Sequence, residues 1–232
     1  MSERVKIILD KNADILRLPA IALRGLVVFP GNIIHFEVGR KKSIAAIEWA
    51  MSNNNAVFLT AQQDMDVEDP GFKDLYAYGV VAEVKQVLRV SDELVKVLVE
   101  GKYRAKLLTL DSSGRFLLAS TKAAALRGTK SVDSARVEAL VRSVKEAFEE
   151  YLSLNPRLSK DVVYTIITNE DAALLCDYIP ANLLLKYTDK QALLNEGTVS
   201  GRLEKLLEIL RRETKILHIE KDIQSKVNEQ MD

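Results

Sequence analysis

The chain contains few side chains that could perform catalysis. His35 lies within an apolar, strand-like run, His218 lies far from it near the C-terminal end, and Cys176 is the single cysteine. Neither histidine has another His or Cys at the spacing of a metal-binding pair. A single cysteine also excludes an internal disulfide and a cysteine-based zinc cluster. We therefore expect structural or solvent-exposed histidines and a buried, unreactive thiol at Cys176.

Three other motifs match chemical sites only in part. Residues 127–131 (RGTKS) lack the Gly-Lys-Ser/Thr sequence and the upstream glycine of a phosphate-binding loop, so an interdomain turn is preferred. The acidic run DMDVEDPG at 64–71 lacks the twelve-residue EF-hand pattern. Tyr76 and Tyr78 could stack on a ligand, but at strand spacing aromatic residues more often fill a core or its rim. These patterns predict no metal or cofactor and favour a binding or assembly module; an enzyme with an unrecognised site is the alternative.

Charge and hydrophobic content narrow the classes of function further. Lys and Arg total 33, and so do Asp and Glu, while 47% of the residues are hydrophobic. Such a chain can bury a core but has no net charge to attract nucleic acid or an anionic membrane. It contains neither a run of about 18 apolar residues nor a secretory signal. We expect a soluble, cytoplasmic protein that binds neither membranes nor nucleic acid.

The first half of the sequence has the pattern of a β-rich lobe. Short runs rich in β-branched residues are separated by turn residues such as Pro30-Gly31. Two longer runs at 79–90 and 94–110 predict a hairpin with a short polar turn. Residues 41–52 change to helical spacing, with Ser43 as the expected N-cap. These features predict a bent or barrel-like sheet with one helix.

The second half has the pattern of a helical bundle. Apolar residues recur there every three or four positions, and Pro156 and Pro180 are expected stops. The last segment, about 198–231, predicts one helix of more than thirty residues. Beyond Arg211 it carries only scattered apolar residues among charges, so we expect a projecting arm that meets more of the same chain or a partner helix. The predicted fold class is α+β.

Several stretches, taken in order, resemble the amino-terminal domain of the Lon family of ATP-dependent serine proteases: LPAIALRGLVVFPG, VGRKKSIAAIEWAM, DLYAYGVVAEVKQVLRV, VKVLVEGKYRAKL, VKEAFEEYLSLNPRLSKDV and DKQALLNEGTVSGRLEKLLEIL. The resemblance implies an N-terminal tail (1–17), a β-rich lobe (18–127) and a helical bundle (128–232). It implies a non-catalytic domain that helps to recognise unfolded or tagged proteins and to organise a hexamer. ATP and Mg²⁺ would bind the family's ATPase domain, which these residues lack, as they lack its Ser-Lys protease domain.

Recognition of unfolded proteins requires exposed apolar surface or an open sheet edge. Two places in the sequence are candidates for such substrate contacts: Leu88, Val90 and Leu94 around the hairpin tip, and Phe29 and Pro30 at the first turn. Ordinary core packing is the alternative for each of these residues. For the whole chain, the alternative function is oligomerisation without any substrate contact.

Overall fold

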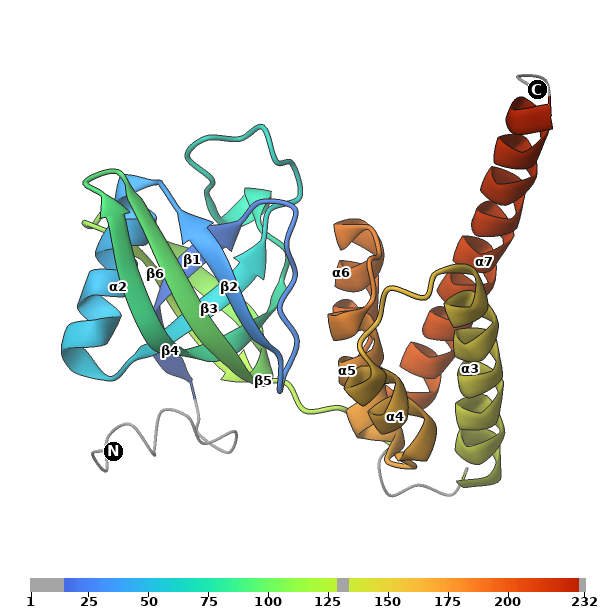
Figure 1. Ribbon diagram of the computed structural model, residues 1–232. Helices are drawn as coiled ribbons and strands as arrows, with labels where there is room; N and C mark the ends of the chain where they lie inside the picture. Colours follow the sequence, from blue (N-terminus) through green and yellow to red (C-terminus); the bar gives the residue numbers. More distant parts are fainter. Residues whose placement is uncertain (1–14, 129–133, 230–232) are drawn as a thin grey trace. The chain divides into compact units, whose positions relative to one another are not determined.

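A computed structural model of the protein describes residues 15–128 and 134–229 (Figure 1). The chain forms two compact units. The β unit contains the residues up to Ala125 together with Leu185–Asn195, and the helical unit contains Leu126–Leu184 and the residues from Glu196 onward. The predicted α+β class is confirmed, including the barrel-like sheet and the long last helix. Most of the predicted tail (1–17) lies outside the described residues, as does most of the RGTKS motif.

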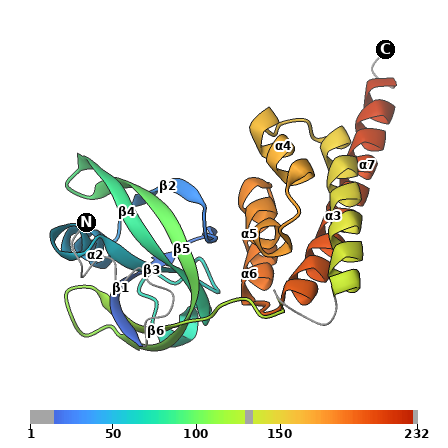
Figure 2. The same ribbon diagram turned by 90° about the horizontal axis from the view of Figure 1, so that it is seen from below.

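Six strands form the sheet of the β unit: β1 (Leu16–Leu23), β2 (Ile33–Val38), β3 (Ala56–Ala61), β4 (Tyr78–Ser91), β5 (Leu94–Asp111) and β6 (Leu117–Ala123). Their order is β2-β5-β4-β3-β1-β6, and a further pairing of β6 with β5 closes all but β2 into a barrel. Closure depends on the 18-residue length of β5, whose first half pairs with β2 and second half with β6. Strands β1 and β3 run parallel, and the other pairs are antiparallel. Figure 2 shows the strands curving around a common centre.

Every second residue of the barrel strands points into a shared core, as the period of a β-strand requires. Phe58 is fully buried there, among small and branched side chains from the neighbouring strands. The buried cluster comprises Leu18, Ala20, Ala22, Ala56, Phe58, Leu75, Val81, Tyr103, Ala105, Leu107, Leu117 and Ala119. Five of these twelve residues are alanines, which leave room inside a narrow barrel for the larger Phe58 and Tyr103.

Helix α2 (Lys41–Asn53) contacts β1 and β3 and is the helix predicted between the strands. Ile44 and Ile47 are buried, as their spacing predicts. The predicted N-cap at Ser43 is wrong, because the helix already begins at Lys41 and Arg40 occupies the cap position. Arg40 makes no capping hydrogen bond with its side chain, and Ser43 is buried in the first turn.

A tight turn at residues 29–32 connects the chain to β2. The N–H of Asn32 donates to the carbonyl of Phe29 at 3.1 Å, and Gly31 has a φ of +75°. Pro30 followed by a residue of positive φ is typical of a type II turn. The turn is fixed to β5, since Gly31 N–H donates to Gly101 C=O at 2.8 Å and Gly101 N–H donates to Asn32 C=O at 2.9 Å.

The described helices of the helical unit are α3 (Ser134–Leu154), α4 (Lys160–Thr168), α5 (Ala172–Asn182) and α7 (Val199–Glu229). Helix α7 packs along α3 and also contacts α5. It has 31 residues, and the predicted last residues 230–231 lie outside the described part. Pro180 does not stop α5, which continues to Asn182. A proline so close to the helix end removes one late hydrogen bond and does not block the earlier turns.

Helix α6 (Tyr187–Asn195) belongs to the β unit although its sequence lies among the helices of the other unit. Arg104 of β5 holds its C-terminal end: Nε donates to Leu194 C=O at 2.6 Å and Nη2 to Asn195 C=O at 2.8 Å. The same guanidinium lies 3.9 Å from the centre of the Tyr78 ring, so Tyr78 has a packing role. Gln191 adds a hydrogen bond of 2.9 Å from its Nε2 to Tyr78 C=O.

A buried ion pair lies in the helical unit. Arg202 of α7 is fully buried and pairs with the carboxylate of Asp177 on α5, while its Nη2 donates to Glu196 C=O at 3.1 Å. The neighbouring Cys176 is also fully buried, and this burial raises the pKa of its thiol to about 12. A thiol protonated at neutral pH is a poor nucleophile, in agreement with the unreactive cysteine expected from the sequence.

Removal of Asp177 should destabilise the protein strongly. The variant Asp177→Ala leaves the Arg202 guanidinium buried without its carboxylate, which costs about 3–5 kcal/mol in free energy of unfolding. Urea denaturation measures this loss. The control Glu204→Ala removes the exposed partner of Arg136 and should cost under about 1 kcal/mol. Equal losses in the two variants would contradict the role assigned to the buried pair.

A network of four charges joins β4 and β5. Glu83 lies directly opposite Glu100, an unfavourable arrangement for two like charges. Lys85 and Lys102 each contact both carboxylates at 2.7–3.0 Å. Burial disfavours ionisation of Glu83, but hydrogen bonds from Lys85 and Lys102 outweigh it and lower the pKa of Glu83. Hydrogen bonds from Lys102 and Lys85 also lower the pKa of Glu100.

The lowered pKa values predict a contribution to stability that is lost in acid. It is complete above the unfolded pKa of about 4.3 and declines as the pH falls through the lower folded values. We compare the free energy of unfolding of the wild type with that of Glu83→Gln/Glu100→Gln as a function of pH. The difference between them should be constant from about pH 7 to 5 and shrink below about pH 4. A difference that does not change on acidification would disprove the assignment.

Candidate functional site

The residues predicted around the hairpin tip are mostly exposed. Leu88 is 60% exposed, Val90 is 52% exposed, and Leu94 is half-buried. They lie where β4 and β5 end in a short turn, and Ser91 pairs with Leu94 across it. Leu88, Val90 and Leu94, here called the hairpin tip, therefore offer a small apolar surface to solvent.

The predicted residues at the first turn lie elsewhere. Phe29 is fully buried and Pro30 half-buried, so only Pro30 can contact a ligand without rearrangement. The turn is bonded to Gly101. Gly101 lies seven residues beyond Leu94 along β5, which corresponds to ~23 Å at about 3.3 Å per residue. The structure does not bring the two groups of predicted residues together.

Burial separates these residues into two classes with different expected effects. Phe29→Ala should lower the free energy of unfolding by about 3–5 kcal/mol, because it leaves a cavity in the core. Leu88→Ser should change it by less than about 0.5 kcal/mol, because this side chain already faces water. Thermal and urea denaturation measure both values. A large loss in Leu88→Ser would show that the hairpin tip is a packing element and not a free surface.

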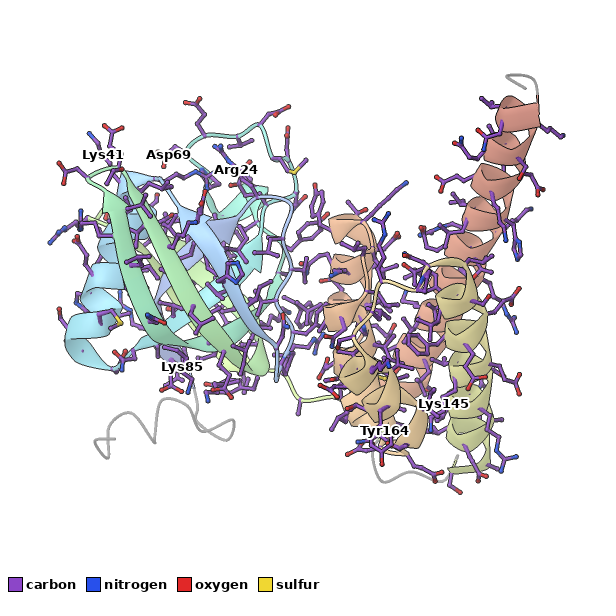
Figure 3. All side chains as sticks on the ribbon, viewed as in Figure 1. Arg24, Lys41, Asp69, Lys85, Lys145 and Tyr164 are labelled. Atoms are coloured by element: carbon purple, nitrogen blue, oxygen red, sulfur yellow. The ribbon has the colours of Figure 1, made fainter. Side chains whose placement is uncertain are left out.

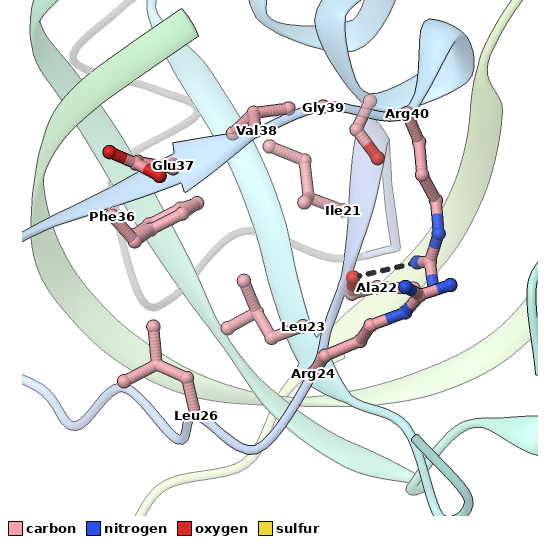
Figure 4. Close-up of a pocket in the computed structure, with 11 residues that line it drawn as sticks. Ile21, Ala22, Leu23, Arg24, Leu26, Phe36, Glu37, Val38, Gly39 and Arg40 are labelled. Carbon is pink, nitrogen blue, oxygen red and sulfur yellow. Dashed lines mark hydrogen bonds between the residues drawn. The ribbon is translucent and has the colours of Figure 1, made fainter. Parts of the chain in front are cut away.

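A cavity of about 570 Å³ lies between β1 and β2 (Figure 4). Residues 21–24 and 26 line one side of it, and residues 36–40 and 43 line the other. We call it the β1–β2 cavity. Its volume is typical of sites that bind small molecules or a few side chains of a peptide. Sequence reasoning missed it, because these two segments are not neighbours along any hairpin and no motif marks them.

The strands beside the cavity have unpaired edges. Among the described strands, β2 pairs with β5 alone, and residues 21–23 of β1 pair with β3 alone. Each segment therefore has one side on which its backbone has no partner strand. Such edges are the places where an extended peptide can add to a sheet.

Two arginines form a polar wall of the cavity. Arg40 donates from Nη1 to Ala22 C=O and from Nη2 to Val67 C=O, both at 3.2 Å, and a further bond joins Nη2 to Gln62 Oε1. Arg24 donates to the same Val67 carbonyl at 3.5 Å. No carboxylate of the described residues forms an ion pair with either arginine. Burial, followed by the charge of Arg24, lowers the pKa of Arg40.

The charges around this wall are arranged at one end of the β unit. Figure 3 places Arg24, Lys41 and Asp69 there, at the end opposite Lys85. Oδ1 of Asp69 forms an ion pair with Nζ of Lys42 at 3.1 Å. The wall therefore holds two guanidinium groups beside an apolar interior, with Glu68 and Asp69 attracting Arg40 from outside ion-pair distance.

The histidines do not form a site. His35 is exposed on β2, and Nε2 of His218 lies 3.7 Å from Glu150 Oε1 on the surface of the helical unit. In residues 15–128 and 134–229, no three His, Cys, Asp or Glu side chains are placed to hold a metal ion. The helices of the same residues include none with the length and apolar character needed to cross a membrane.

A family model described as the ATP-dependent protease La (LON) substrate-binding domain matches residues 17–212. The chain belongs to the Lon protease family. It is 38% identical over 221 residues to the Lon protease of Desulforamulus reducens and 36% identical over 222 residues to that of Escherichia coli strain K12. These alignments cover 95% and 96% of this chain but only 27% and 28% of the two relatives.

Two solved Lon structures share the fold. The N-terminal domain of the Mycobacterium avium complex Lon protease superposes with a TM-score of 0.68 at 20% identity, covering 84% of this chain and 98% of that one. The Lon N-terminal domain protein from Xanthomonas campestris gives 0.58 at 15% identity, covering 83% and 98%. The match to the Lon substrate-binding domain includes the hairpin tip and the β1–β2 cavity, so both candidate surfaces belong to the Lon-like region.

Proposed function

We propose that this chain recognises unfolded or damaged proteins for an ATP-dependent Lon protease. The observation that carries the proposal is the match of residues 17–212 to the Lon substrate-binding domain. The chain spans about a quarter of the length of its curated relatives, so their proteolytic activity is assigned to the whole protein and not to this part.

The exposed apolar side chains of the β unit support this proposal. Leu88 and Val90 of the hairpin tip are exposed, and a further apolar residue, Ile33 on the edge strand β2, is 62% exposed. Shallow apolar contacts tolerate many sequences, as a domain that accepts different unfolded proteins requires. Backbone bonding at a sheet edge is equally independent of sequence.

The catalytic steps belong to other parts of Lon proteins in this proposal. This chain then neither hydrolyses ATP nor cleaves peptide bonds, and ATP and Mg²⁺ bind the ATPase domain of the family. The cytoplasmic location expected from the sequence stays a prediction.

Assembly with other copies is the second role that we propose. Ile216, Ile219, Ile223 and Val227 follow one another along α7 at spacings of three and four and are 38–57% exposed. An apolar stripe of this spacing is typical of helices that pair with another helix. It supports the self-association expected for a family of hexamers.

Binding to an unfolded protein tests the main proposal. The 232-residue chain is titrated into a fluorescently labelled, reduced and carboxymethylated protein and into the native form of the same protein. We expect binding of the unfolded form at least tenfold tighter, because only that form exposes apolar segments. Fluorescence anisotropy measures both affinities, and light scattering reports the mass of the chain alone.

A matched pair of variants locates the contact. Leu88→Ser/Val90→Ser should weaken binding of the unfolded protein at least threefold. The control Leu184→Ser removes a 78% exposed leucine from the helical unit and should leave the affinity unchanged. Equal affinity for native and unfolded protein, together with a mass above the monomer, would shift the function from recognition to assembly.

A further inference from the structure

The β1–β2 cavity combines two chemistries. Its apolar part is formed by Ile21, Leu23, Leu26, Phe36 and Val38, and its polar part by Arg24, Arg40 and Ser43. Figure 4 shows Leu23, Leu26 and Phe36 facing the space on one side, with the two guanidinium groups close together on the other. A ligand that fills the cavity must therefore be apolar over most of its length and anionic, or rich in acceptors, at one end.

The polar part has a donor without an acceptor. Nε of Arg40 is buried and has no hydrogen-bond partner among the described residues. Ser43, which is only 6% exposed, lines the same part of the cavity. A buried polar group without a partner is costly, so such groups commonly mark a position that a ligand or water fills.

The start of α2 strengthens the preference for an anion. The first hydrogen bond of the helix runs from Ile44 N–H to Arg40 C=O at 2.9 Å, so the N–H groups of residues 41–43 precede it. The first turn contains no acidic residue and has no side-chain cap. A helix N-terminus in this state carries a partial positive charge, which adds to that of Arg24 and Arg40.

The nearby carboxylates leave this charge available. Asp69 pairs with Lys42, and Glu68 and Asp69 act on Arg40 only through longer-range attraction. Glu37 also lines the cavity, but its carboxylate forms an ion pair with Lys96 at 3.4 Å. Because side chains alternate along a strand, Glu37 points to the face of β2 opposite Phe36 and Val38.

We propose that the β1–β2 cavity binds the C-terminal end of a polypeptide whose last side chains are apolar. The free α-carboxylate lies against Arg24, Ser43 and the start of α2, and the last side chains lie against Leu26 and Phe36. The unpaired edge of β2 bonds the backbone of the bound segment, because Ala22 C=O on the open side of β1 already accepts a hydrogen bond from Arg40. This inference rests on the proposed function, since it names the class of protein segment that the domain takes.

A polypeptide end is favoured over a fatty acid by the unpaired edge of β2. A fatty acid supplies the same carboxylate and apolar chain but has no N–H or C=O groups to pair with a strand. An internal Asp or Glu supplies a carboxylate, but its chain continues past the guanidinium groups and needs further room beyond them. The α-carboxylate ends the chain at these groups.

The probe is a labelled six-residue peptide whose last three residues are leucine, valine and leucine, and fluorescence anisotropy measures its binding to the 232-residue chain. The same peptide ending in a carboxamide should bind at least tenfold more weakly. Octanoate, which has the carboxylate and the apolar chain alone, should compete at least tenfold more weakly than the unlabelled peptide. Equal binding of acid and amide, or equal competition by octanoate, overturns the proposal.

Variants locate the site. Arg24→Gln should weaken binding of the acid peptide at least fivefold and leave the affinity for the amide peptide unchanged. The Arg24 side chain makes one exposed hydrogen bond of 3.5 Å, to Val67 C=O, so we expect the variant to fold as the wild type does. Ser43→Ala should weaken binding of the acid peptide at least twofold. The control Arg115→Gln removes an equally charged, 77% exposed side chain outside the cavity and should change neither affinity. Unchanged acid binding in Arg24→Gln overturns the proposal.

A parallel titration with the unfolded protein separates this inference from the function on which it rests. If the chain binds unfolded protein but does not discriminate acid from amide, the inference fails and the proposed function stands. If the chain binds neither unfolded protein nor peptide, both fail.

Discussion

The close approach of two backbones at Gly101 is the constraint on which the β unit depends. A Cβ at this position would lie 2.2 Å from the carbonyl oxygen of Phe29, which no side chain can tolerate. Because β5 carries no side chain there, the turn at 29–32 can bond to both the N–H and the C=O of Gly101. That contact starts β2 on the free side of β5, and β2 then forms one side of the β1–β2 cavity. The binding surface is therefore set by a residue that does not line it.

Buried arginines organise both units through backbone carbonyls. Arg104 satisfies the carbonyls at the end of α6, and Arg202 adds the carbonyl of Glu196 to its pairing with Asp177. A helix C-terminus carries partial negative charge, so a guanidinium is a suitable partner there. Arg40 acts in the same way on Ala22 and Val67, but part of its donor capacity is unused. Nε of Arg202 is likewise buried without a partner among the described residues, so Arg40 differs from it by its place in the wall of the β1–β2 cavity.

Local periodicity was sufficient to predict most elements, and tertiary contacts explain where it was not. The alternation of β-branched residues in 79–110 defines the hairpin, since it depends only on the period of a strand. Ser43 was misassigned because a serine near a helix start usually caps it, whereas here the helix begins two residues earlier and Ser43 lies in its first turn. The cavity itself was beyond the sequence, because strand order brings residues 21–26 and 36–43 together and no local pattern encodes that order. Phe29 was a candidate contact on chemistry alone, and only the packing of the turn shows it to be core.

Helix α6 has a consequence for how this domain can be inherited. The β unit takes in residues 185–195 from within the sequence of the helical unit, so neither unit is one continuous stretch of chain. A recombination event near residue 125 would separate Arg104 and Tyr78 from α6, so that Arg104 would lose its bond to Leu194 C=O and Tyr78 C=O its bond from Gln191. The two units can thus be exchanged among proteins only together, as one segment that begins with β1 and includes α7.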